Sequence, residues 1–383
     1  MAELLDGVTV LDLASVGPAA RASRWLADYG ANVIKVGAVP ARGAVQITPP
    51  FYSYSAHRRM KRLLLDLKAA AGREAFLALA DRADVVIESF RPGVVDRLGI
   101  GYAAVSERNP RIVYCSTTGF GQDGPHAQWA GHDLDYLGVG GYLDCTERGP
   151  GGKPPVPGAT VADSAGGGMH AVMSILAALA GRATSGAGCY LDVSAADGVL
   201  ALMALQVDEH LATGVLPGPG SGLLTGRYAC YDTYACRDGK WLAVAAIEPR
   251  FWGNLCRALG IEQWTDRQLD DNVRDEVRAD VAAAFATRDR HDWVAELAPA
   301  DTCVAPVLSV AELVDDPQYA ARGAFVTARH PVHGEFRQVA PTLAGMVRED
   351  TYDVRDPDVT DTDELLAAIG LDSAPLRAAG VVA

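Results

Sequence analysis

Val8-Thr9-Val10-Leu11-Asp12-Leu13 and Asn32-Val33-Ile34-Lys35-Val36 are short apolar runs, and the residues between them, from Ala19 to Tyr29, have the amphipathic pattern of a helix. The two runs are rich in β-branched residues, which favour strands. Strand, helix and strand in this order predict two parallel strands joined by a right-handed crossover. The fold class follows as α/β, with an open Rossmann-like sheet in the first part of the chain.

The same alternation continues to about residue 120. We expect a helix from Arg73 to Asp81, followed by strands at Val85-Val86-Ile87 and Arg111-Ile112-Val113-Tyr114-Cys115. Loops that follow the carboxyl ends of such strands are where an open α/β sheet binds ligands. The sequence has no G-x-G-x-x-G or Walker motif there, which disfavours an enzyme that uses a nicotinamide or a nucleoside triphosphate.

A second, smaller unit is expected because 383 residues exceed the usual size of one hydrophobic core. The segment from Gly214 to Gly222 is the clearest break and predicts a linker. Beyond it we expect a β-hairpin that turns at Asp238-Gly239, then helices from Pro249 to Leu259 and from Val273 to Ala286.

The charge balance excludes several classes of partner. With 34 basic and 48 acidic residues the net charge is −14, which argues against general binding to nucleic acid or to an anionic membrane. Neither a signal peptide nor an uninterrupted run of about 18 apolar residues is evident, so we expect a cytoplasmic protein. Seven cysteines without a C-x-x-C pair indicate reduced thiols and no zinc or other metal site.

Two segments carry the candidate chemistry, Gly131-His132-Asp133 and Ala162-Asp163-Ser164. A neutral imidazole can take a proton near pH 7, and a buried, protonated carboxyl group can deliver one. His132 and Asp163 are therefore candidates for two groups that face one carbon, as inversion beside a carbonyl requires. The alternative is a surface histidine and, at Asp163 or Ser164, the N-cap of an apolar helix over residues 169–179.

Motifs through most of the chain resemble the CaiB/BaiF family, the class III coenzyme A transferases. They include Leu26-Ala27-Asp28-Tyr29-Gly30-Ala31, Ser89-Phe90-Arg91-Pro92-Gly93, Thr118-Gly119-Phe120-Gly121 and Cys303-Val304-Ala305-Pro306. Gly131-His132-Asp133 is similar to the α-methylacyl-CoA racemase branch, since the transferases differ at that position. Asp163 stands where the transferases carry the aspartate that forms an acyl anhydride.

The resemblance implies a domain organisation and a set of catalytic residues. Residues 1–213 and 318–383 would form a large coenzyme A-binding domain, and residues 214–317 a linker and a small α+β domain. Two such chains would interlock as a homodimer with the active site shared between subunits. His132 and Asp163 would act as the acid and base, Glu248 would orient the imidazole, and Asp133 would begin a helix whose N–H groups bind an enolate oxygen. For Glu248 a solvated loop position remains the alternative.

The coenzyme would be part of the substrate, with no prosthetic group and no metal. The run His57-Arg58-Arg59-Met60-Lys61-Arg62 offers four permanent positive charges, and guanidinium groups suit phosphate oxygens. The resemblance selects Arg58 and Arg91 as the coenzyme-binding residues, while a solvated charge run is the alternative for residues 57–62. The loop Gly37-Ala38-Val39-Pro40 departs from the family pattern, because an acidic residue usually follows Lys35-Val36.

Three functions are consistent with these features. The first is an α-methylacyl-CoA racemase that interconverts the 2R and 2S epimers of 2-methyl-branched acyl-CoA thioesters. The second is a class III coenzyme A transferase in which Asp163 is the covalent nucleophile. The third is an acyl-CoA-binding protein without catalytic activity. His132 favours the racemase.

Overall fold

The chain forms two structural units. The computed structural model describes residues 3–40, 50–356 and 359–383. The first unit comprises Met1–Gly141, Val156–Ala204 and Pro317–Ala383, and the second comprises Tyr142–Pro155 and Leu205–Asp316. Residues 142–155 and 205–213, which we had placed in the large domain, therefore belong to the second unit. Pro317, which we had placed in the small domain, belongs to the first unit.

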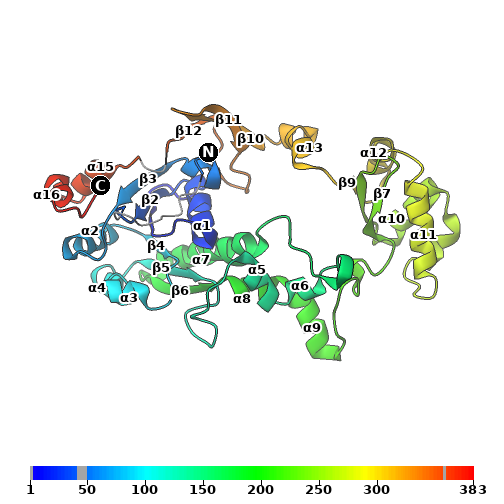
Figure 1. Cartoon of the computed structure of the whole chain (residues 1–383), viewed down its shortest axis with the longest axis horizontal. Helices are drawn as coiled ribbons and strands as arrows, with labels where there is room; N and C mark the ends of the chain where they lie inside the picture. The colour runs from blue at the N-terminus through cyan, green and yellow to red at the C-terminus, as the bar shows by residue number, and fades with distance from the viewer. Residues whose placement is uncertain (1–2, 41–49, 357–358) are drawn as a thin grey trace. The chain divides into compact units, whose positions relative to one another are not determined.

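A six-stranded parallel sheet is the centre of the first unit (Figure 1). Its strands lie in the order β3-β2-β1-β4-β5-β6, and every neighbouring pair is parallel. Their bounds are β1 Thr9–Asp12, β2 Asn32–Gly37, β3 Met60–Leu64, β4 Val85–Glu88, β5 Val113–Thr118 and β6 Cys189–Ser194. The expected α/β class is confirmed. In this order the chain reverses direction across the sheet between β1 and β4, the place where such sheets bind ligands.

Two hydrophobic cores cover the two faces of this sheet. Val10, Val33, Val85 and Val113 pack against helices α1 (Gly17–Asp28) and α7 (His170–Ser185) on one face. The next residue of each strand points to the opposite face, where α2 (Ala70–Ala80) and the C-terminal helices α15 (Thr362–Ala368) and α16 (Ser373–Ala378) pack. Burial on both faces explains why the strands are almost continuously apolar.

The remaining elements of the first unit connect or flank the sheet. They are the 3-10 helix η1 (Ser53–His57), α3 (Val94–Leu98), α4 (Tyr102–Arg108), α5 (Asp133–Val139), the π-helix η3 (Ala162–Met169), α8 (Ala195–Leu202) and α14 (Pro317–Ala321). A small separate sheet contains β10 (Phe325–His330), which pairs antiparallel with β11 (Gly334–Val339) and parallel with β12 (Thr351–Asp353).

The second unit has the expected hairpin and helices. β7 (Tyr231–Ala235) and β8 (Trp241–Ala245) are antiparallel, Gly239 in their turn has φ +72°, and β9 (Val304–Pro306) pairs with β8. Helix α10 (Pro249–Leu259) has the predicted bounds, and α11 (Arg274–Phe285) lies within them. The other helices are α6 (Tyr142–Cys145), α9 (Ala204–Thr213, starting at the boundary of the units), α12 (Arg290–Leu297) and α13 (Val310–Val314). All seven cysteines are free thiols.

One helical stretch could cross a bilayer by length and composition alone, contrary to our expectation. Ala162–Ser185, made of η3 and α7, is 24 residues long, and about a third of its most apolar part is buried. Its residues pack against α1, α8 and β5. A core helix of a soluble protein passes the same test, so the stretch is weak evidence for a membrane span.

Glu88, at the carboxyl end of β4, gives the fold a pH dependence. Only 1% of the residue is exposed, and burial raises its pKa to about 7. A carboxyl group whose pKa is higher in the folded than in the unfolded chain favours folding at pH values below its ordinary pKa of 4.5. This contribution to stability is lost as the pH rises towards 7. Glu88→Gln should therefore stabilise the protein by about 2–3 kcal/mol at pH 8 and by much less at pH 5.

Urea unfolding at the two pH values measures this difference. Glu107→Gln, at an exposed position of α4, is the matched control and should change stability equally little at both. The same gain for Glu88→Gln at pH 5 and pH 8 would show that the Glu88 carboxyl is not perturbed.

Candidate active site

A cavity of about 440 Å³ lies at the point where the strand order reverses. Its walls come from the start of α1, from residues 89–92 after β4, from the end of β5 and the residues after it, and from residues 127–132. His132 and Asp163 both line it, as does Arg91. All these residues belong to the first unit.

The start of helix α5 holds His132 in place. His132 is the exposed N-cap residue, and its backbone N–H donates to the Asp135 carboxylate at 2.8 Å. The Tyr136 hydroxyl donates to the Gly131 carbonyl at 2.5 Å. A Cβ at Gly119 or Gly131 would meet the Tyr136 ring at 2.3 or 2.8 Å, so both glycines let the backbone approach the ring. Asp133 begins α5 as expected.

Asp163 projects from the π-helix η3 and caps no helix, so the prediction of an N-cap is wrong. The helical conformation already begins at Val161, and no side-chain cap bond is formed. The cause is the packing of the glycine triplet: a Cβ at Gly167 would meet Pro18 of α1 at 2.6 Å, and one at Gly166 would meet the Ala195 carbonyl of α8 at 2.7 Å. Short π-helical stretches of this kind are frequent at functional sites.

One hydrogen bond ties the two segments together. The backbone N–H of Asp163 donates to an Asp133 carboxylate oxygen at 2.8 Å, so the residue after His132 positions the segment that carries Asp163. On its other side, Asp163 forms an ion pair with Arg21 of α1 at 3.4 Å. The structure thus brings His132, Asp133 and Asp163 close to one another, and their catalytic roles remain predictions.

The pKa of the Asp163 carboxyl group is raised, although nearby charges act on it in both directions. Burial raises the pKa of its carboxyl group, Arg21 opposes this, the neighbouring Asp133 adds to it, and His132 opposes it. A carboxyl group with a raised pKa beside an imidazole can exchange protons with a substrate carbon at moderate pH.

The two predicted phosphate ligands lie in different environments. Arg91 is exposed at the cavity, and its side chain forms no hydrogen bond or ion pair within the described residues. Arg58 does not line the cavity and only 1% of its side chain is exposed. Its guanidinium donates to both Asp28 oxygens at 3.1 and 3.0 Å, to Gln338 at 3.1 Å and to the Val339 carbonyl at 2.7 Å.

Arg58 is therefore a structural residue, which corrects our expectation that it binds the coenzyme. Two other cations of the basic run also have acidic partners, Arg59 with Glu3 and Lys61 with Glu364. A buried guanidinium whose N–H groups already donate to protein oxygens has no free pair of donors for the oxygens of a phosphate. Arg91 remains the predicted phosphate ligand.

Glu248 lies in the second unit, where it is exposed and is the N-cap residue of α10. Its carboxylate is one of the charges that raise the pKa of the Cys303 thiol, after burial. Its predicted partnership with His132 remains a prediction.

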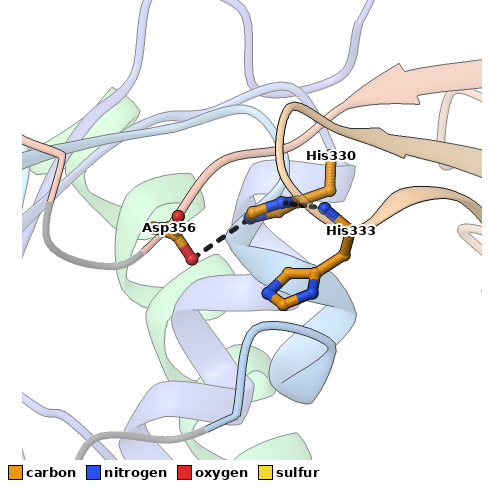
Figure 2. A group of neighbouring side chains, drawn as sticks. All are labelled: His330, His333 and Asp356. Carbon is orange, nitrogen blue, oxygen red and sulfur yellow. Dashed lines mark hydrogen bonds and ion pairs between the residues drawn. The ribbon is translucent and has the colours of Figure 1, made fainter.

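One group of side chains outside the cavity has the residue types of a metal site. Ligand atoms of His330, His333 and Asp356 lie within 4.8 Å of one another (Figure 2). However, His330 Nδ1 accepts the backbone N–H groups of Val332 and His333, each at 3.2 Å. The proton of a neutral His330 ring therefore belongs on Nε2, which lies 3.3 Å from Asp356. A metal at Nε2 would have to displace that proton, so the arrangement fits a turn held by His330 better than a metal centre.

Two residues of the site were not identified from the sequence. Tyr136 lies three residues after the Gly131-His132-Asp133 motif, and its contact with Gly131 depends on the fold. Arg21 had a detectable signal: it is a cation near the start of a helix that follows the carboxyl end of a strand, the part of an open sheet that faces ligands.

An open parallel sheet with a histidine and an aspartate in the cavity at its switch point defines a class of α/β enzymes suited to proton transfer or to covalent capture by a carboxylate. Residues 5–358 match the sequence profile of CoA-transferase family III. The chain belongs to this family, and it is an enzyme.

The relatives include both reaction types. Alpha-methylacyl-CoA racemase of Homo sapiens is 30% identical over 391 residues, which cover 95% of this chain and 100% of that protein. Acetyl-CoA:oxalate CoA-transferase of Acetobacter aceti is 31% identical, over 84% of this chain and 85% of the relative. The crystal structure of a CaiB/BaiF family protein from Brucella suis superposes with a TM-score of 0.78 at 29% identity, covering 95% and 99% of the two chains. Identity at this level assigns the family and leaves the reaction open.

Proposed function

We propose that this enzyme is an α-methylacyl-CoA racemase, which interconverts the 2R and 2S epimers of 2-methyl-branched acyl-CoA thioesters. The observation that carries the proposal is the pairing of His132 and Asp163 in one cavity, tied together by the hydrogen bond from the Asp163 N–H to Asp133. The extent of the similarity to the human racemase supports it further.

The reaction requires one proton to leave the α-carbon and another to arrive on its opposite face. A thioester makes this C–H bond more acidic than an ester does, yet its cleavage still needs a positioned base. One of the pair, His132 or Asp163, takes the proton while the electron pair of the C–H bond moves into the enolate. The other then donates a proton to the opposite face, and the configuration inverts.

The enolate oxygen needs stabilisation while it carries negative charge. Backbone N–H groups in the first turn of α5, beside His132, are the proposed donors. For Glu248 we retain the proposal that its carboxylate orients the imidazole.

We propose that the substrate's coenzyme A is held through Arg91, the exposed guanidinium at the cavity. Arg91→Ala should weaken binding of free coenzyme A by about 1.5–3 kcal/mol, roughly tenfold or more, because charged hydrogen bonds to phosphate are lost. Calorimetry with the full-length protein measures this loss.

The control is Arg73→Ala, which removes an exposed arginine from α2 and should leave the affinity unchanged. The fragment pantetheine, which lacks the phosphates, should bind the wild type and Arg91→Ala equally weakly. Equal affinity of the wild type for coenzyme A and for pantetheine would refute the phosphate contact.

We also propose a homodimer in the cytoplasm. Leucines on α8 and α9 are largely exposed in the single chain, with exposed fractions of 51% for Leu200 and Leu202, 63% for Leu205 and 76% for Leu211. Exposed apolar side chains of this size are typical of protein–protein contacts where they form a patch.

The second candidate is coenzyme A transfer, favoured by the position of Asp163 and by relatives such as the Acetobacter transferase. There Asp163 would attack the thioester carbonyl, expel the coenzyme thiolate and form an acyl anhydride. Incubation of a single epimer in D2O tests the choice, since only the racemase route exchanges the α-proton with solvent.

A further inference from the structure

Arg21 is held rigidly beside Asp163. Its Nη1 lies 3.4 Å from Asp163 Oδ2 and donates to the Gly17 carbonyl at 3.3 Å, while Nη2 donates to the Thr160 hydroxyl at 2.7 Å. The guanidinium also lies over the Tyr54 ring, 5.4 Å from its centre. Its contacts with Gly17, Thr160 and Tyr54 leave this permanent cation little freedom. Its side chain is 22% exposed, and the residue lines the cavity.

Arg91 and Tyr54 line the same cavity, and the charged or titratable groups that interact electrostatically with Asp163 besides Arg21 come from the start of α5. They are His132, Asp133 and Tyr136. Asp133 is an acid that accepts the Asp163 N–H and therefore cannot move away. Without a cation, two carboxylates would lie side by side in a partly buried site, which disfavours ionisation of one of them. Arg21 supplies the compensating charge from α1.

We propose that Arg21 is a positioning residue that acts through Asp163, holding this carboxyl group ionised and in one orientation so that the proton shared by the catalytic pair rests on His132 between turnovers. The inference rests on the proposed racemase for its consequence in turnover. The ion pair itself does not depend on which reaction Asp163 performs.

In turnover, the resting carboxylate is the base towards one epimer. The α C–H bond breaks, its electron pair enters the enolate, the proton joins an Asp163 oxygen, and His132 gives its proton to the opposite face. For the other epimer each transfer runs in reverse. The ratio of kcat/KM for the two epimers equals their equilibrium constant, which no variant can change, so loss of Arg21 must change both values by the same factor.

The ionisation of Asp163 can be measured in the full-length free enzyme by carbon-13 NMR of labelled aspartate carboxyl groups, with the Asp163 signal identified by its loss in Asp163→Asn. Arg21→Gln, and Arg21→Met as a second neutral replacement, should move the midpoint of this titration to higher pH. Arg21→Lys should restore it towards the wild-type value, and the control Arg73→Gln should leave it unchanged. A midpoint that is the same in the wild type and both neutral variants would overturn the inference.

The pH profile of racemisation gives the second readout. In Arg21→Gln, kcat/KM should fall on the order of tenfold on the acidic side, equally for both epimers, and much less at pH 8. A uniform loss at every pH would indicate a merely structural role and would also overturn the inference. If the NMR midpoint moves but the wild type does not racemise either epimer, the proposed function fails while the ion-pair inference stands.

Discussion

Replacing His132 by alanine or Asp163 by asparagine is expected to lower the rate of epimer interconversion by about 10²–10⁴-fold, because each removes one of the two proton-transfer groups. Each variant should nevertheless exchange the α-proton of one epimer with D2O, the epimer whose proton faces the remaining group. His132→Ala should favour exchange of one epimer and Asp163→Asn that of the other. Proton NMR of each epimer in D2O measures exchange, and chiral separation measures inversion.

His291→Ala is the matched control, since His291 is an exposed histidine on α12 of the second unit. It should leave exchange and inversion at wild-type rates. If Asp163→Asn abolished inversion while His132→Ala left it unchanged, two-base catalysis would be contradicted.

Gly198→Ala should destabilise the protein by about 3 kcal/mol or more, since overpacking of this severity cannot be relieved by side-chain motion. A Cβ at position 198 would lie 1.8 Å from the Gly166 carbonyl oxygen, which is backbone of the π-helix η3. To relieve the clash, α8 and η3 must separate, and Asp163 moves with η3. We therefore expect lost stability in urea unfolding together with lost activity in the remaining folded protein.

Gly181→Ala is the control for this substitution. Gly181 lies within α7, and a Cβ there would meet nothing within 4 Å. Alanine at such a helix position should be neutral or stabilise by about 0.5–1 kcal/mol. Wild-type stability of Gly198→Ala would mean that α8 and η3 do not pack as closely as described.

Several strands and helices of the first 120 residues were predictable because their signals are local, whereas β3, which overlaps the basic run of residues 57–62, was not predicted. The pattern from Val8 to Val36 is a strand, a helix and a strand over a continuous stretch, and the structure has β1, α1 and β2 there. β6 was not predicted. Its first four residues, from Cys189 to Asp192, are exposed or only partly buried, so they do not form the continuous apolar run that marks the inner strands. The β10–β11 hairpin has Pro331-Val332-His333 at its turn, without the Asn-Gly or Asp-Gly signal that marked the other hairpin.

The pairing of His132 with Asp163 followed from residue types and family resemblance, whereas the environment of each residue did not. Asp163 lies in a π-helix because glycines 166–168 are packed between α1 and α8, which no local pattern reveals. Arg58 was predicted to bind phosphate from the family resemblance. Its burial could not be foreseen, because its partners Asp28 and Gln338 are 30 and 280 residues away in the sequence. Burial, which decides what an arginine can bind, is a property of the folded chain.

Two-base racemisation, the central claim, is tested most directly by incubating the wild-type enzyme with a single epimer of a 2-methylacyl-CoA in D2O, with no acceptor acid present. We predict that deuterium enters the α-position and that the other epimer accumulates in parallel, until the two epimers are at equilibrium. The contradicting result is an α-proton that stays unexchanged, together with an acyl group on Asp163 that hydroxylamine traps. That outcome would assign the enzyme to coenzyme A transfer.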